Sequence, residues 1–324
     1  MDAPKLAMTM MIVSAPRGKV IGGSSSITAM VYLRGHPGDF DDWQAMGNPG
    51  WGWSDVLPYF RKSETSDQGA SEFRGGDGPL YISTMDRDLH PTCQNFIRAG
   101  VECGLTHNPD LNAATNEGIG LYQNTAKGGF RMSAARAYLN PARKRANLTV
   151  LSRAHATRIL FDGLRATGVE FVRHGAIERV HAAREVIVSG GSVNSPQLLM
   201  LSGVGPADVL KRHGIDVVRQ QPNVGRHLQD HLCIDHTYRA RVRTLNDELR
   251  PLMGKLWHGL NYVLRRRGPL SLGVNQAGGF IRTRPELERP NMQLYFSPVS
   301  YTKAPPGKRP LMSPDPFSGV IMGT

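Results

Sequence analysis

A loop of small residues near the start of the sequence has the residue types of a cofactor-binding site. Gly22 and Gly23 allow close approach of the backbone, and Ser24, Ser25 and Ser26 add hydroxyl and amide groups at the expected start of a helix. Such a loop suits the phosphates or the polar ring edge of a bound cofactor. Taken alone, a glycine loop before a helix is more often an ordinary turn.

A second junction of the same kind lies in the middle of the chain. The apolar stretch Glu185–Ser189 is predicted to be a buried strand that breaks at Gly190-Gly191 and leads into a helix capped by Ser195. Sheet edges with this geometry are used to bind the ribose and phosphate of nucleotides. The same pattern is also typical of a turn that binds nothing.

Histidine is the residue type best suited to general base catalysis near neutral pH. His231 follows Asp230, but neighbours in sequence point in different directions, so His231 is more typical of a structural histidine. His155, His174 and His181 lie in or between predicted strands and are expected to be exposed. The sequence shows no Ser-His-Asp spacing and no metal-ligand cluster, so it predicts neither a catalytic residue nor a metal site.

Helices and strands alternate around these junctions. The apolar segment Ile27–Leu33 is expected to open a helix from the first loop. Further helices are predicted at Asp39–Trp43, Ser54–Lys62, Pro91–Gly104, Ser133–Arg145 and Leu252–Arg267. Strands are predicted at Leu148–Leu151, Ala156–Phe161, Ala166–Arg173, Ile177–Ala182, Glu185–Ser189, Ile234–Val242, Ala277–Arg282, Met292–Ser300 and Gly319–Met322. The predicted fold class is α/β.

The flanks of the two junctions make them more specific. The segment Arg17–Asp41 resembles the first signature of the glucose-methanol-choline (GMC) oxidoreductases, and Gly191–Gly205 resembles their second signature at every constrained position. Further segments similar to this family are Arg131–Leu139, Gly168–Phe171 and Val224–His231. The resemblance runs from about residue 16 to residue 296, and Tyr32–Pro37 favours the choline-dehydrogenase-like branch of bacteria.

The resemblance implies a binding site for FAD. The residues that would lie against the flavin and its pyrophosphate are Val20, Gly22, Gly23, Ser24, Ser25 and Ser26. Those that would follow the edge of the isoalloxazine ring are Thr28, Ala29, Met30 and Val31, with Thr28 standing where Asn or His is usual. Ile27 occupies the position at which members with a covalent flavin carry His, so FAD is expected to be bound non-covalently.

The resemblance places the adenosine half of FAD on later residues. Thr157 would hold the adenine through backbone groups, and Ser189, Gly190 and Gly191 would pack near the adenosine. The implied reaction is oxidation of a primary alcohol to an aldehyde by hydride transfer to the flavin, with electrons passing to a quinone or other acceptor. The implied location is the cytoplasm, with contact to the inner membrane surface left open.

The resemblance also predicts the domain organisation. Residues 16–85 and 141–235 are expected to belong to an FAD-binding domain, and residues 86–140 and 236–324 to a substrate domain built on an antiparallel sheet. Residues 1–15 are expected to lie outside the family. The family's G-x-G-x-x-G turn and its C-terminal catalytic histidine are not found, so the chain is expected to be the central portion of such an enzyme. The alternative is a catalytically inert remnant that binds FAD poorly or not at all.

Composition excludes several other classes of protein. The net charge is +12, but the basic residues form no dense stripe interleaved with aromatic residues, which argues against nucleic-acid binding. Three cysteines without CxxC spacing favour a reducing compartment. No apolar run approaches the ~20 residues needed to cross a bilayer, and the first residues make a poor signal peptide.

Overall fold

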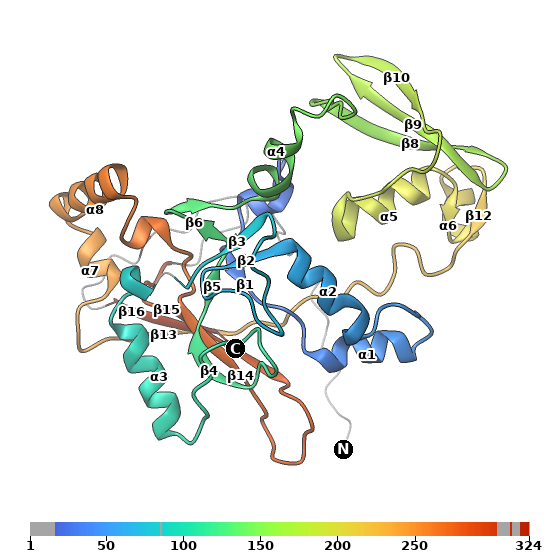
Figure 1. Ribbon diagram of the computed structural model, residues 1–324. Coiled ribbons are helices and arrows are strands. Elements are labelled where there is room, and N and C mark those ends of the chain that lie inside the picture. Colours follow the sequence, from blue (N-terminus) through green and yellow to red (C-terminus); the bar gives the residue numbers. More distant parts are fainter. Residues whose placement is uncertain (1–16, 85, 303–311, 313–317, 324) are drawn as a thin grey trace, which may run out of the picture. The chain divides into compact units, whose positions relative to one another are not determined.

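The computed structural model describes residues 17–84, 86–302, 312 and 318–323 (Figure 1). The chain divides into two compact units, which we call the larger unit (residues 1–145 and 233–324) and the smaller unit (residues 146–232). Both combine helices with antiparallel strands, which confirms the predicted α/β class. The segment 1–15 is outside the described residues, and the division into FAD-binding and substrate domains stays a prediction.

A four-stranded antiparallel sheet forms the centre of the larger unit. Its strands lie in the order β13 (Asp235–Arg239), β16 (Ser318–Gly323), β15 (Met292–Ser297) and β14 (Ala277–Ile281). These four strands confirm the four predicted after residue 233. The segment predicted as one strand over Ile234–Val242 is shorter than expected at both ends.

Helix α3 (Thr92–Glu102) packs against this sheet and closes its core. The ring of Phe96 stacks on that of Phe296 with a centroid separation of 4.6 Å, and Cys93 and Ala277 are fully buried beside them. Burial raises the pKa of the Cys93 thiol to about 12, because the thiolate would be poorly solvated there. Cys93 is therefore an inert apolar residue.

Strand β4 (Gly118–Leu121) lies close to β14, and this closeness requires glycine. A Cβ atom at Gly279 would lie 2.0 Å from the carbonyl oxygen of Gly118. Just after β4, the hydroxyl of Tyr122 donates to the carbonyl oxygen of Leu294 in β15 at 2.6 Å. The sheet is thereby tied to a segment far away in the sequence.

Helices α1 (Pro37–Ala45) and α2 (Trp53–Ser63) confirm two predicted helices. Their apolar faces meet in an aromatic cluster, in which Phe40 lies 5.4–5.7 Å from Trp43, Trp53 and Phe60 between ring centroids. Two parallel strands follow, β2 (Glu64–Ser66) and β3 (Leu80–Ile82).

A buried ionic network links these elements to the rest of the larger unit. Glu64 is fully buried and pairs with Arg34 through one carboxylate oxygen and with Arg74 through the other. Arg74 continues to Asp110 at 2.8 Å and to the side-chain oxygen of Gln123 at 2.8 Å. Buried charges of this kind are tolerated only when paired and hydrogen-bonded, so the network fixes the mutual positions of four chain segments.

The remaining elements of the larger unit lie outside the four-stranded sheet. They are the 3-10 helices η1 (Gly23–Ser26), η2 (Asp86–Asp88) and η4 (Pro269–Ser271), the strands β1 (Val31–Tyr32), β5 (Gln123–Asn124), β6 (Ala126–Lys127) and β7 (Phe130–Arg131), and the helices α4 (Asn140–Ala142), α7 (Leu245–Leu249) and α8 (Leu252–Arg265). Helix α8 confirms the prediction over Leu252–Arg267. The helix predicted over Ser133–Arg145 is present only as a π-helical segment, Ala135–Leu139, followed by α4.

The helix predicted over Ile27–Leu33 is wrong. Val31 and Tyr32 form strand β1, which pairs with β5. Met30, just before it, has a left-handed backbone (φ 65°) that no α-helix contains. The β-branched Ile27 and Val31 also fit a strand better than a helix, and pairing with a distant segment decided the outcome.

The smaller unit is built on an antiparallel ribbon of three strands. These are β8 (Ala154–Asp162), β9 (Arg165–Arg173) and β10 (Ala176–His181), and they confirm three predicted strands. Helix α5 (Gly191–Leu201) lies along β8, and a two-stranded parallel pair, β11 (Val204–Gly205) and β12 (Arg219–Gln220), adjoins α6 (Ala207–Arg212).

Three predictions for the smaller unit are wrong. Leu148–Leu151 and Glu185–Ser189 form no strand, because a strand needs hydrogen-bonded neighbours and none of the described residues pairs with either segment. Ser195 does not cap α5. The helix begins four residues earlier at Gly191, with Gly190 as its N-cap, and includes Pro196.

Candidate functional site

The backbone of the loop at Gly22 and Gly23 adopts a conformation that only glycine accepts without strain. Gly22 has φ 96° and Gly23 has φ 57°, both in the left-handed region. A Cβ atom at Gly22 would lie 2.6 Å from Ser26 Oγ and 3.1 Å from Ala135 Cβ, whereas a Cβ atom at Gly23 would meet nothing within 4 Å. Gly22 is therefore packed against the protein, and Gly23 faces open space.

The serine hydroxyls of this loop hold the loop itself. Ser25 Oγ donates to the carbonyl oxygen of Gly22 at 2.5 Å and accepts from the amide of Ala134 at 2.9 Å. Ser26 Oγ donates to the carbonyl oxygen of Ile21 at 3.1 Å. The amide of Gly23 donates to the carbonyl oxygen of Val20 at 2.9 Å, so the backbone that follows Gly23 in η1 is the better candidate for ligand contact.

Arg131 is the residue here that sequence reasoning missed. Its Nη1 donates to the carbonyl oxygen of Thr28 at 2.6 Å and to that of Ser25 at 3.3 Å. Partial burial lowers its pKa, but an arginine stays charged at neutral pH. No carboxylate of the described residues pairs with Arg131, so the loop carries a net positive charge. Its place at the start of the motif Arg131–Leu139 was the available signal.

The residues that follow the loop are anchored by a distant strand. The carbonyl oxygen of Met30 accepts from the amide of Thr125 at 2.8 Å and from its hydroxyl at 3.2 Å, and Val31 pairs with Asn124. A Cβ atom at Gly273 would lie 2.2 Å from the carbonyl oxygen of Ala29. Met30 is buried in its strained conformation, as is typical of residues near functional sites.

Thr157, in the smaller unit, occupies an irregular position in strand β8. Ala156 pairs with Phe171 and Arg158 pairs with Glu170, so Thr157 is the extra residue of a β-bulge. Its hydroxyl lies 3.1 Å from the carbonyl oxygen of Glu170. The extra residue of a bulge has no partner in the ladder, and bulges are common beside binding sites.

Ser189, Gly190 and Gly191 form the start of α5. Gly190 makes no side-chain cap, and Gly191 has φ 85° with nothing within 4 Å of a Cβ atom. The amides at the start of an eleven-residue helix and its macrodipole favour an anion at this place. The second junction is thus open at Gly191 and lacks the predicted cap, and no strand precedes it.

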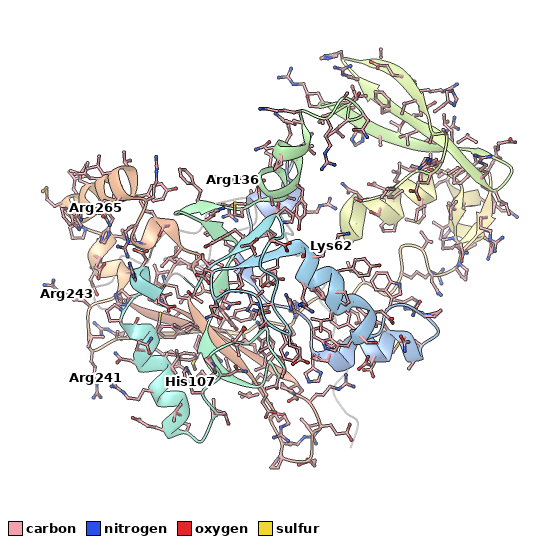
Figure 2. All side chains as sticks on the ribbon, in the orientation of Figure 1. Lys62, His107, Arg136, Arg241, Arg243 and Arg265 are labelled. Atoms are coloured by element: carbon pink, nitrogen blue, oxygen red, sulfur yellow. The ribbon has the colours of Figure 1, made fainter. Side chains whose placement is uncertain are left out.

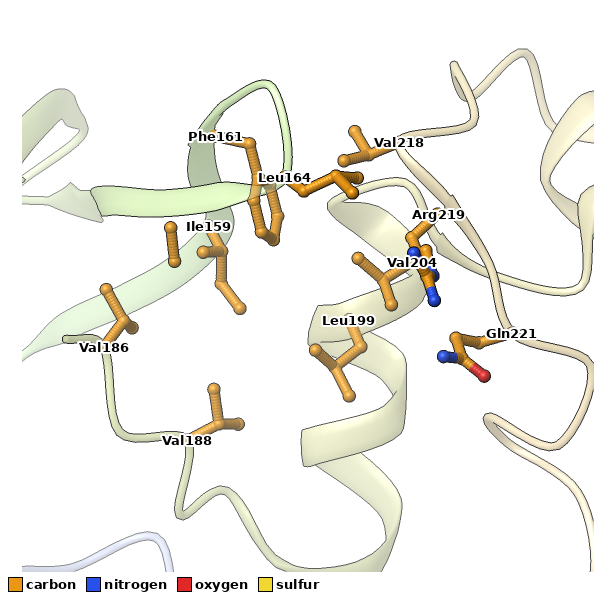
Figure 3. A pocket seen from close by; sticks show the side chains of 11 residues that line it. Ile159, Phe161, Leu164, Val186, Val188, Leu199, Val204, Val218, Arg219 and Gln221 are labelled. Carbon is orange, nitrogen blue, oxygen red and sulfur yellow. The ribbon is translucent and has the colours of Figure 1, made fainter.

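An apolar pocket of about 360 Å³ lies in the smaller unit, and its lining includes residues close in sequence to Thr157 and to Ser189 (Figure 3). Ile159, two residues after Thr157, and Val188, next to Ser189, point into it together with Leu199 of α5. The other lining residues are Phe161, Leu164, Ala166, Val186, Val204, Val218, Arg219 and Gln221. Such a lining suits an apolar side chain or a flat ring and not a phosphate.

A second pocket of about 430 Å³ lies in the larger unit. Its charged lining residues are Asp67, Asp86, Asp88, Arg87, Arg265, Arg266 and Arg267. Asp88 contacts Arg267 at 3.4 Å and accepts from the amide of Gly268 at 2.8 Å. The two signs of charge nearly balance, so this pocket does not attract one class of ion.

The structure brings the predicted site residues together in two groups. Those from Val20 to Val31 lie in the larger unit, and Thr157 with Ser189 to Gly191 lies in the smaller unit. His155, His174, His181 and His231 are exposed, which confirms the expectation for the first three. The described residues contain no cluster able to hold a metal ion and no helix long and apolar enough to span a bilayer.

Comparison with known sequences decides the family. The sequence model described as GMC oxidoreductase matches residues 6–233. This chain belongs to the GMC oxidoreductase family. The resemblance drawn from the two glycine junctions is thereby confirmed.

Two relatives within the family show how much of the chain is shared. It is 43% identical to an alcohol dehydrogenase [acceptor] of Pseudomonas putida over 88% of this chain and 52% of that protein. It is 45% identical to human mitochondrial choline dehydrogenase over 87% of this chain and 48% of that protein. The chain spans about half the length of the curated relatives it matches.

Solved GMC structures agree with the fold. A formate oxidase superimposes with a TM-score of 0.83 and 26% identity, covering 95% of this chain and 58% of its own. An FAD-dependent oxidoreductase from Chaetomium thermophilum gives a TM-score of 0.75 and 30% identity, over 82% of this chain and 49% of its own.

Proposed function

We propose that this chain is part of an FAD-dependent oxidoreductase that oxidises a primary alcohol to an aldehyde and holds the flavin non-covalently. The observation that carries the proposal is the loop at Gly22-Gly23. Its backbone is left-handed at both glycines and open to a ligand at Gly23, and the guanidinium of Arg131 is hydrogen-bonded to the carbonyl oxygens of Thr28 and Ser25. The identity of 43–45% to alcohol and choline dehydrogenases supports the reaction class.

The residues of the loop fit a dinucleotide with a flat ring system. Gly23 lets the backbone approach a pyrophosphate, and Arg131 compensates the phosphate charge without a competing carboxylate among the described residues. Val20, Ile21 and Ile27 expose 57%, 45% and 52% of their surface, which supports contact with a flat apolar ring.

When bound, FAD supplies the acceptor for the hydride that leaves the alcohol carbon. The role proposed for this chain is to position the flavin. Thr28 and Ala29 are exposed and held by the Arg131 and Met30 hydrogen bonds, so their backbone forms a rigid edge. Rigid placement of this kind is what a hydride transfer requires.

The smaller unit is proposed to hold the adenosine half. The unpaired backbone of Thr157 offers a donor and an acceptor for the edge of an adenine, and the amides at Gly190 and Gly191 suit the anionic part of the nucleotide. Non-covalent binding follows from Ile27, whose hydrocarbon side chain offers no nucleophile to the flavin. The quinone or other electron acceptor and a cytoplasmic location remain part of the proposal.

A visible absorption spectrum after adding FAD, followed by gel filtration, tests the proposal. Flavin bands are expected to co-elute with the chain. The variant Gly23→Ala is expected to weaken FAD binding about tenfold, which corresponds to about 1.4 kcal/mol, because the added methyl group fills the space where the ligand approaches. Gly163→Ala is the matched control, since Gly163 has φ 55° and an equally open environment in the β8–β9 turn.

The two variants separate binding from stability. Both carry the same backbone strain of about 1–2 kcal/mol, so they are expected to lose equal stability while only Gly23→Ala loses FAD affinity. A chain that stays colourless with excess FAD contradicts the proposal and favours the alternative of an inert remnant. Equal FAD affinity of the two variants would remove the loop from the site.

A further inference from the structure

Helix α8 presents an unusual face to solvent. At ~100° per residue, its apolar side chains form one continuous arc of about 140°. We call this the α8 apolar face, and its residues, each 53–74% exposed, are Leu252, Met253, Leu256, Trp257, Leu260, Val263 and Leu264. Surface helices of globular proteins usually bury such an arc, whereas α8 turns it to solvent.

The polar face of α8 makes the attachments to the larger unit. His258 lies 3.3 Å from Glu248 of α7, and the hydroxyl of Tyr262 donates to the carbonyl oxygen of Gly129 at 3.2 Å. A Cβ atom at Gly254 would lie 1.9 Å from the carbonyl oxygen of Glu248. These contacts hold the polar side inward, so the outward orientation of the apolar face is built into the packing.

The charged residues around α8 indicate which kind of partner the α8 apolar face could bind. From residue 250 to residue 284 the sequence contains no Asp or Glu, and its charged residues are Arg250, Lys255, Arg265, Arg266, Arg267, Arg282 and Arg284. Lys255 and Arg265 lie on α8 beyond opposite borders of the apolar arc, and both are exposed. Figure 2 shows Arg241 and Arg243 extending outward from the segment that joins β13 to α7.

We propose that the α8 apolar face inserts into the interface of an anionic lipid membrane, with the helix lying in the membrane plane. An apolar arc with tryptophan, bordered on the same helix by the exposed cations Lys255 and Arg265, is the pattern of interfacial helices. With fourteen residues, α8 is about 21 Å long, too short to span a hydrocarbon core of about 30 Å. Arg250, Arg267, Arg282 and Arg284 pair with carboxylates, so the charges that complement anionic headgroups are those of Lys255 and Arg265, with Arg241 and Arg243.

Vesicle flotation of the purified chain tests this proposal without FAD or turnover, so its outcome is independent of the proposed function. Vesicles of phosphatidylcholine and phosphatidylglycerol in equal parts are compared with vesicles of phosphatidylcholine alone. The chain is expected to float with the former, less with the latter, and less at high salt. The double variant Leu256→Gln and Leu260→Gln is expected to bind at least about tenfold more weakly, because two apolar contacts with the membrane are lost.

A matched control keeps the test specific. Met46→Gln with Tyr59→Gln also removes two exposed apolar side chains, 77% and 70% exposed, from another surface of the larger unit. It is expected to leave flotation unchanged. Lys255→Gln with Arg265→Gln is expected to weaken binding to the anionic vesicles by roughly tenfold and to leave binding to phosphatidylcholine unchanged. All these positions are exposed, and circular dichroism checks that each variant folds.

Three outcomes would overturn the proposal. One is a chain that stays with the soluble fraction in both kinds of vesicle. Another is flotation that the leucine and control variants reduce equally. The third is self-association of the chain in solution that Leu256→Gln with Leu260→Gln abolishes, which would make the α8 apolar face a contact between copies.

Discussion

The two glycine junctions look alike in sequence but are built differently. At the first, Arg131, Ala134 and Thr125 reach the loop or the residues after it from about 95–109 positions away along the chain. At the second, Gly190 makes no cap, and Gly191 stands in open space. A glycine pair therefore specifies a permissive backbone, whereas the fixed geometry of a site is made by residues elsewhere in the sequence.

The largest effect is expected at Gly22, where packing adds to backbone strain. Gly22→Ala should lower the free energy of unfolding by about 3 kcal/mol, since left-handed backbone costs about 1–2 kcal/mol and the methyl group also crowds Ser26 and Ala135. Gly47→Ala is the control, because Gly47 has φ 97° with no neighbours. Urea unfolding of both variants measures the difference. Equal losses would mean that the first loop is no more tightly packed than an exposed turn.

A smaller effect is expected from Arg131, which tests the long-range clamp. Arg131→Gln should cost about 2 kcal/mol of stability, because hydrogen bonds from a charged donor to two carbonyl oxygens are lost. It should also weaken FAD binding, whereas Arg131→Lys should preserve more of the affinity than of the stability. Arg143→Gln, at an exposed position of the same unit, is the control. FAD affinity unchanged in Arg131→Gln would contradict a role for its charge.

The smallest effect is expected at the second junction. Gly191→Ala should cost about 1 kcal/mol, from left-handed backbone alone. Gly175→Ala, with φ 83° and equally open surroundings in the turn after β9, should cost the same. Thermal or urea unfolding of the pair checks this. A clearly larger cost at Gly191 would show that the second junction is packed as the first is, and the contrast between them would fail.

Sequence reasoning succeeded where structure is local. Helices α1, α2, α3 and α8 follow from periodicity and glycine stops, and the ribbon of β8, β9 and β10 follows from alternation with Gly163 and Gly175 at its turns. The loop at Gly22-Gly23 and the family were likewise identified from residues close together in the chain. These features need no knowledge of distant segments.

The failures share one cause. Val31 joined a strand because a partner segment some ninety residues later pairs with it, and Glu185–Ser189 is no strand because no described segment pairs with it. Arg131 belongs to a motif in the sequence, but only the fold shows that it reaches Thr28 and so belongs to the site. Strand pairing and long-range hydrogen bonds are properties of the folded chain, and a local pattern cannot specify them.

The division of the chain also sets an order of assembly. The smaller unit is one continuous stretch, and its ribbon is made from neighbouring strands, so it can form as soon as it leaves the ribosome. The larger unit has to wait, because Tyr122 bonds to Leu294 and His90 to Gln276 across more than 170 residues. During synthesis its first half therefore remains without these partners while the insert between them is already compact, and this interval is the one in which a chaperone would be most useful.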